Sequence, residues 1–194
     1  MSVTLSRPGR RPNSGGEELI DVRRLCDLAA HRVTDPRLHA ELDAVCLRTA
    51  TALNAQVALV SFLLDSAQLV GGQFGLRGWV LHVGGAPAEW VPCAEVVRTG
   101  QGLVLEDVLD DATFGDNPLF GEGRLRAYAG YPLRSRQGHL LGAHCVLSTR
   151  PRTFGAGDLH RLRDGAREAE QVLAEHRHRA ASVPGDDVLV HAPQ

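Results

Sequence analysis

Residues 107–154 read DVLDDATFGDNPLFGEGRLRAYAGYPLRSRQGHLLGAHCVLSTRPRTF, and this stretch decides the fold. It contains two apolar, β-prone runs at 125–134 and 140–148, which predict strands. The residues SRQG at 135–138 separate these runs and predict a hairpin turn. The preceding residues 110–123, rich in Asp and Gly, predict a loop or a broken helical turn. The second half of the chain is therefore expected to contain an antiparallel pair of strands.

The flanking sequence predicts helices at both ends and further strands in the middle. Apolar residues at helical spacing predict amphipathic helices over 17–32, 36–55 and 157–181. Short apolar runs predict strands at 57–64, 69–76 and 103–108, and residues 86–99 predict a short helix. Helices placed first and last around antiparallel strands indicate an α+β layer protein. We expect one domain over residues 17–181, with disordered tails at 1–16 and 182–194.

Composition excludes several classes of function. The 194 residues include 21 basic and 23 acidic side chains, a formal net charge of -2, which argues against a general nucleic-acid binder. Every basic side chain is an arginine, so Schiff-base chemistry and a P-loop lysine are excluded. Because Ile20 is also the only isoleucine, this bias indicates a high-GC bacterial genome.

The sequence predicts a cytoplasmic protein without a membrane partner. No apolar stretch reaches the ~18 residues that cross a bilayer, and the N-terminus lacks the apolar core of a secretory signal. The four cysteines, Cys26, Cys46, Cys93 and Cys145, form no CxxC pair. In a reducing cytosol we expect them to be free thiols, most of them buried.

The central stretch resembles the second half of a GAF domain. Residues 127–133 read AYAGYPL and residues 141–148 read LGAHCVLS, similar to the F-Y-A-G-x-P-L and L-G-x-L-C-V-L-D strands of one bacterial GAF subfamily. The N-P-L at 117–119 fits the D-x-R-F-x-x-N-P-L element of the same subfamily, whereas Ala127, His144 and Ser148 depart from its pattern. The resemblance covers about residues 35–175. It implies a central antiparallel sheet with amphipathic helices on one face and a small-molecule cavity, or its vestige, on the other.

The resemblance also indicates which cofactors to expect. Bilin-binding relatives attach a tetrapyrrole to a cysteine on the cavity helix, where this chain has Cys93, but Ala94 replaces the histidine that usually follows. Cyclic-nucleotide-binding relatives carry an N-K-F-D-E signature, which a chain without lysine cannot supply. Neither a bilin nor a cyclic nucleotide is therefore expected.

If the cavity takes a ligand, aromatic side chains and a few polar groups are expected to form its walls. The residues predicted for this ligand site are Phe74, Trp79, Trp90, Cys93, Phe114, Asn117, Tyr128 and His144. The alternative is that the same side chains fill the cavity as core. His144 and Cys145 are neighbours on a strand, so they cannot both face one cavity.

No metal site is predicted. His82, His139 and His144 are the histidines that could join Cys93 as ligands, but no short-range pair among them has metal-ligand spacing. Solvated or hydrogen-bonded histidines explain them more simply.

The C-terminal helix carries an apolar stripe with spacings of three and four residues. The stripe consists of Leu159, Leu162, Ala166, Ala169 and Leu173. Such a stripe predicts a helix pair between two chains, so these residues are assigned to a dimer surface. The alternative is that the helix docks on its own sheet.

The resemblance implies a non-catalytic small-molecule sensor or signalling adaptor, acting as a homodimer or on a partner protein in trans. The alternative from the enzyme class is a thiol-dependent reductase of the GAF-fold free methionine sulfoxide reductase type, in which Cys93 would attack the sulfoxide. A third hypothesis is a structural interaction module with a vestigial cavity.

Overall fold

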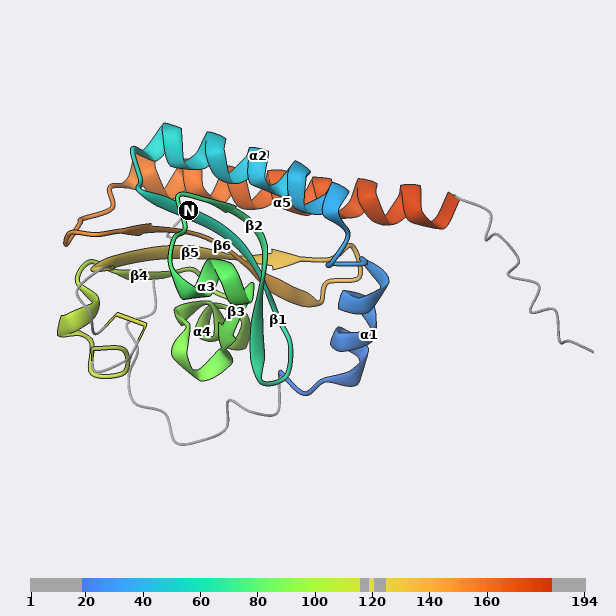
Figure 1. Ribbon diagram of the computed structural model, residues 1–194, viewed down its shortest axis with the longest axis horizontal. Coiled ribbons are helices and arrows are strands. Elements are labelled where there is room, and N and C mark those ends of the chain that lie inside the picture. Colours follow the sequence, from blue (N-terminus) through green and yellow to red (C-terminus); the bar gives the residue numbers. More distant parts are fainter. Residues whose placement is uncertain (1–18, 116–118, 121–124, 183–194) are drawn as a thin grey trace, which may run out of the picture.

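The computed structural model describes residues 19–115, 119–120 and 125–182, and its centre is a six-stranded antiparallel sheet with helices on both faces (Figure 1). The α+β fold class predicted from the sequence is confirmed. The predicted tail at 1–16 lies outside the described residues, and so does the predicted tail at 182–194 except for its first residue.

The sheet has the strand order β3-β2-β1-β6-β5-β4. Its strands are β1 (Val57–Leu63), β2 (Ala67–Phe74), β3 (Gly85–Pro87), β4 (Leu103–Leu105), β5 (Ala127–Arg134) and β6 (Leu140–Ser148). The turn predicted at 135–138 joins β5 to β6, and a register shift interrupts this pair between Leu133 and Arg134. Beyond the shift, Tyr128 lies opposite Leu147 and Gly130 lies opposite Cys145.

The two longest helices cover one face of the sheet. Helices α2 (Pro36–Leu53) and α5 (Ala156–Ser182) lie side by side there, and α1 (Val22–Ala30) lies at one end of the sheet (Figure 1). The Asp35 side chain accepts a hydrogen bond from the Arg37 amide and caps α2, while Pro36 begins it. Ala58, Val60 and Phe62 alternate along β1 and pack against these helices.

The apolar stripe of α5 is buried within the chain. Its members are at most 9% exposed and belong to the core that the helices form with the sheet, and they are Leu159, Leu162, Ala166, Ala169 and Leu173. Because these side chains already contact α2 and the sheet, they are not available to a second chain. The structure therefore shows the intrachain alternative and corrects the assignment of this stripe as a dimer surface.

The opposite face of the sheet carries short elements. They are α3 (Trp79–Val83), η1 (Ala88–Trp90), α4 (Pro92–Thr99) and η2 (Val108–Asp110). The single helix predicted over 86–99 is wrong in its first half, because residues 85–87 pair with β2 as β3 and only the part from Pro92 onward is α-helical. Proline lacks an amide hydrogen, so Pro92 begins a helix more readily than it continues one. Helix α3 was not predicted.

None of the helices in the described part of the chain is long and apolar enough to cross a membrane.

Candidate functional site

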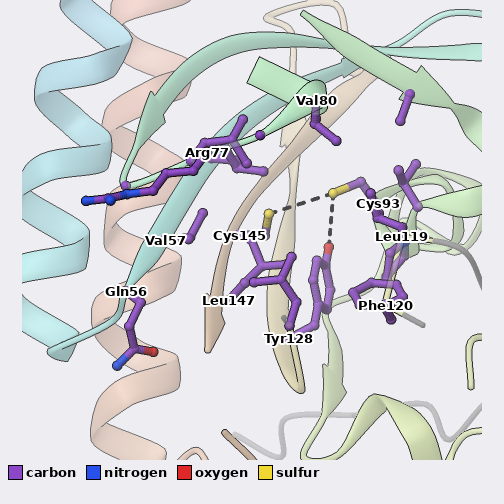
Figure 2. A pocket seen from close by; sticks show the side chains of 18 of the residues that line it. Gln56, Val57, Arg77, Val80, Cys93, Leu119, Phe120, Tyr128, Cys145 and Leu147 are labelled. Carbon is purple, nitrogen blue, oxygen red and sulfur yellow. Dashed lines mark hydrogen bonds between the residues drawn. The ribbon is translucent and has the colours of Figure 1, made fainter. Parts of the chain in front are cut away.

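A cavity of about 740 Å³ lies between the sheet and the short helices on the second face (Figure 2). Odd-numbered residues of β1 and β6, including Val57, Cys145 and Leu147, form its floor. Val80 of α3 and Cys93 of α4 contribute to its other walls. The complete lining is Gln56, Val57, Leu59, Gln68, Phe74, Gly75, Leu76, Arg77, Gly78, Val80, Ala86, Val91, Pro92, Cys93, Leu119, Phe120, Leu125, Tyr128, Cys145, Leu147 and Thr149. A mainly apolar cavity of this size with a few polar groups is typical of small-molecule sites.

The structure brings three of the predicted site residues to this cavity. Phe74, Cys93 and Tyr128 line it. Phe114 is buried in the neighbouring apolar core, and Trp90 is half-buried in η1, and neither lines the cavity. Asn117 lies outside the described residues, and Trp79 is placed by its backbone as the first residue of α3.

His144 does not line the cavity, and its prediction as a wall residue is corrected. Its side chain lies on the face of the sheet covered by α2 and α5, with Nδ1 3.0 Å from the Leu59 carbonyl oxygen and Nε2 2.9 Å from the Thr49 hydroxyl. A carbonyl can only accept, so Nδ1 carries the proton and Nε2 accepts from Thr49. Burial lowers the pKa of His144 to about 4, and the ring is neutral at pH 7.

Cys145 takes the place in the cavity that was predicted for His144. The two residues are adjacent on β6 and point to opposite faces, as strand geometry requires. The register shift between Leu133 and Arg134 decides which of them faces the cavity. Without the shift, counting from the turn would place Val146 and His144 on the face of Tyr128, whereas the shift places Leu147 and Cys145 there.

Two cysteine side chains meet at the cavity wall. The Sγ atoms of Cys93 and Cys145 lie 3.8 Å apart, and the Tyr128 hydroxyl donates to Cys93 Sγ across 3.3 Å (Figure 2). Cys93 is the second residue of α4, Cys145 belongs to β6 and Tyr128 to β5. Three parts of the chain that are distant in sequence therefore build this contact.

The three groups have different proton affinities. The hydrogen bond with Cys145 lowers the pKa of Cys93 against the opposing effect of burial, and the Tyr128 hydroxyl contributes in the same direction. The same hydrogen bond and burial raise the pKa of Cys145. Burial raises the pKa of Tyr128 well above its ordinary value, so its hydroxyl remains a donor. Cys93 is therefore the thiol of this pair that ionises first.

Gly130 gives the Tyr128 hydroxyl its space. A Cβ atom on Gly130 would lie 2.2 Å from that hydroxyl oxygen, which is closer than non-bonded atoms approach. The side chain of Tyr128 reaches Cys93 because its neighbour on the same face of β5 has no side chain.

One polar atom of the cavity wall lacks a partner. Gln68 on β2 is 3% exposed, and its Oε1 atom is buried without a hydrogen bond from any residue that the structure describes. A buried carbonyl oxygen without a donor costs about 1 to 3 kcal/mol. Sequence reasoning missed Gln68, since a glutamine in a strand carries no signal of this kind.

The histidines considered as metal ligands do not come together. His82 Nδ1 contacts the Gly78 carbonyl oxygen, His139 pairs with Asp27, and His144 lies on the other face of the sheet. Within the described ranges, no group of three or more His, Cys, Asp or Glu side chains could hold a metal ion.

The chain belongs to the GAF domain family, because the model of this family matches residues 37–173. This identification agrees with the central antiparallel sheet and with the cavity on the face opposite α2 and α5.

Among curated proteins, the chain is similar to the cyclic di-GMP phosphodiesterase PA2567 of Pseudomonas aeruginosa, with 35% identity over 98 residues. The match covers 50% of this chain and 16% of the phosphodiesterase, so the chain corresponds to only a small part of that relative.

Solved structures share the fold at low sequence identity. The GAF domain of a phosphoenolpyruvate-protein phosphotransferase from Coxiella burnetii superposes with a TM-score of 0.63 at 19% identity, covering 87% of this chain and 99% of that one. A free methionine-R-sulfoxide reductase from Neisseria meningitidis, solved with its substrate, superposes with a TM-score of 0.60 at 15% identity, covering 92% and 98%. At these identities the likeness shows the common fold alone.

Proposed function

We propose that this GAF domain protein is a non-catalytic small-molecule sensor or signalling adaptor whose ligand occupies the cavity. The observation that carries the proposal is the buried Oε1 atom of Gln68, which has no donor from the described chain and belongs to a residue that lines the cavity of about 740 Å³. A ligand that donates a hydrogen bond to this atom would remove the cost of leaving it unpaired. The ligand is therefore a mainly apolar small molecule that carries at least one hydrogen-bond donor.

The sheet offers a route from the cavity to the long helices. On β6, Cys145 lines the cavity and the adjacent His144 accepts the hydrogen bond of Thr49 on α2. A ligand that moves the floor of the cavity acts on this contact. Occupancy would then shift the position of α2 and α5, which an output partner in trans or a second copy of the chain would recognise. The size of this shift is limited by the difference in ligand affinity between the two positions of the helices.

The test compares two tryptophan substitutions on α3 by native mass spectrometry of protein purified gently from its host. Val80 lines the cavity, whereas Val83 on the same helix is 72% exposed. We expect a non-covalently bound small molecule on the wild type and on Val83→Trp, and its loss from Val80→Trp. If all three proteins carry no ligand, the cavity is vestigial and the interaction-module hypothesis replaces the sensor.

A thiol-dependent reductase is the second candidate, favoured by the 3.8 Å contact of Cys93 and Cys145. The Cys93 thiolate would accept the oxygen of a sulfoxide and become a sulfenic acid, leaving the sulfide as product. Cys145 would then attack Cys93 Sγ to form a disulfide, and the oxygen would leave as water. Turnover of free methionine sulfoxide with dithiothreitol as reductant, lost in Cys93→Ser, is the result expected of this candidate.

A further inference from the structure

The hydrogen bond proposed between a ligand and Gln68 does not involve the two thiols on the cavity wall. We propose that Cys93 and Cys145 form a two-electron redox site, which a hydroperoxide entering the cavity converts to an intramolecular disulfide. This modification site goes beyond ligand sensing and does not depend on it. Both side chains line the cavity, and they come from opposing elements, α4 and β6.

The geometry requires only a small movement. A disulfide bond is about 2.05 Å long, so Sγ atoms that begin 3.8 Å apart must approach by roughly 1.8 Å. We expect rotation of the Cys93 side chain and a slight shift of the first turn of α4 to supply this movement. Cys93 and Cys145 are 3% and 0% exposed, which leaves the cavity as the route for a small oxidant.

The surroundings assign different roles to the two thiols. Cys93 accepts the Tyr128 hydroxyl hydrogen bond and lies in the first turn of α4, where backbone amides favour a negative charge. Contact with Cys145 lowers the pKa of Cys93, while the pKa of Cys145 is raised. Cys93 is therefore the attacking thiolate, and Cys145 is the resolving thiol that keeps its proton until the second step.

The reaction balances with the hydroperoxide as the oxidant. Cys93 Sγ attacks the terminal peroxide oxygen, the O–O bond breaks, and the alkoxide leaves as an alcohol after protonation. Cys145 then attacks Cys93 Sγ, the S–O bond breaks, and hydroxide leaves as water with the proton that Cys145 releases. Two thiols and one hydroperoxide give one disulfide, one alcohol and one water, with two electrons passing from sulfur to oxygen.

The test uses the whole chain with Cys26→Ser, because Cys26 is the exposed cysteine. The protein is treated with hydrogen peroxide, unfolded in urea with iodoacetamide, and analysed by intact mass and peptide mapping. We expect one alkyl group, on Cys46, and a cross-linked pair of peptides containing Cys93 and Cys145. Cys46 is the internal control, since it lies in the core on the other face of the sheet and burial raises its pKa to about 12.

Further variants measure the role of each group. In Tyr128→Phe we expect disulfide formation to slow between about threefold and tenfold, since the thiolate loses a hydrogen bond. In Cys145→Ala we expect Cys93 to stop at the sulfenic acid, which dimedone traps. The peroxide reaction of the parent protein decides the proposal even if these buried variants do not fold.

Three results with the parent protein would overturn the proposal. The first is alkylation of all three remaining thiols after peroxide treatment, and the second is irreversible oxidation of Cys93 while Cys145 remains alkylatable. The third is a disulfide formed by free methionine sulfoxide but not by peroxide, which would support the reductase candidate. Absence of a bound ligand in native mass spectrometry leaves this reaction unaffected, so the two functions fail separately.

Discussion

His144 is expected to make the stability of the folded protein depend on pH between 6.5 and about 4. Burial lowers the pKa of its imidazole from 6.5 to about 4, partly opposed by the hydrogen bond to the Leu59 carbonyl and by the charge of Glu168. In the unfolded chain the ring binds a proton below pH 6.5, whereas in the folded chain it stays neutral until about pH 4. Its contribution to stability is therefore constant above pH 6.5 and is lost as the pH falls through this window.

The size of the effect follows from the two pKa values. At about 1.4 kcal/mol for each pH unit, the interval from 6.5 to about 4 corresponds to about 3 kcal/mol. Between pH 7 and pH 5 the same two values give a loss of about 2 kcal/mol in the free energy of unfolding. This is a large part of the total stability of an ordinary domain, so the effect is measurable.

The assay is urea unfolding of wild type and His144→Asn across this pH range. Asparagine keeps a donor for the Leu59 carbonyl and removes the titrating ring, so we expect the variant to lose about 2 kcal/mol less than wild type between pH 7 and pH 5. His160→Asn is the matched control, because His160 lies on α5 with a side chain that is 69% exposed. If wild type and His144→Asn lose stability in parallel, the neutral buried imidazole is not the cause and the reasoning is wrong.

Three further changes test the packing and the cavity. Gly165→Ala places a Cβ atom 2.5 Å from the Thr49 hydroxyl oxygen and should lower the free energy of unfolding by about 1 to 3 kcal/mol. The control Gly157→Ala meets only a side-chain nitrogen at 3.5 Å and should raise the free energy of unfolding by up to about 1 kcal/mol. Equal urea midpoints for the two variants would contradict this expectation. Gln68→Met removes the unpaired carbonyl, so we expect the free energy of unfolding to rise by about 1 kcal/mol. Calorimetry should show roughly tenfold weaker binding of the co-purifying ligand, and an unchanged affinity would mean that Gln68 does not bind the ligand. Leu162→Ala should lower the free energy of unfolding by about 2 to 5 kcal/mol without changing the sedimentation of the folded protein. Dissociation of a dimer at unchanged stability would instead show that the apolar stripe of α5 joins two chains.

Most secondary structure could be predicted from local signals. The β5–β6 hairpin, the β1–β2 pair and the helix begun by Pro36 follow from apolar periodicity and turn residues, which act over a few neighbouring positions. The segment 85–99 was harder, because a three-residue edge strand and a 3₁₀ turn have no periodicity long enough to recognise. Helix α3, five residues long, escaped prediction for the same reason.

The candidate site could be predicted only in part. Phe74, Cys93 and Tyr128 reach the cavity as expected. Phe74 and Tyr128 were predicted as aromatic wall residues, and the resemblance placed Cys93 on the cavity helix. Whether His144 or Cys145 faces the cavity depends on a register shift between β5 and β6. The alternation of residues along each strand does not show where such a shift occurs.

The sequence by itself determined the order of the longer helices and strands and the exclusion of lysine-dependent chemistry, because composition and periodicity are local properties. The family followed from the resemblance of residues 127–133 and 141–148 to strands of a GAF domain. Only the tertiary structure decided that the α5 stripe packs on its own sheet and that Cys93 meets Cys145. An apolar stripe has the same spacing whether its partner is the same chain or another one. Two thiols 52 positions apart become neighbours only when strand register and helix docking bring their side chains to one face.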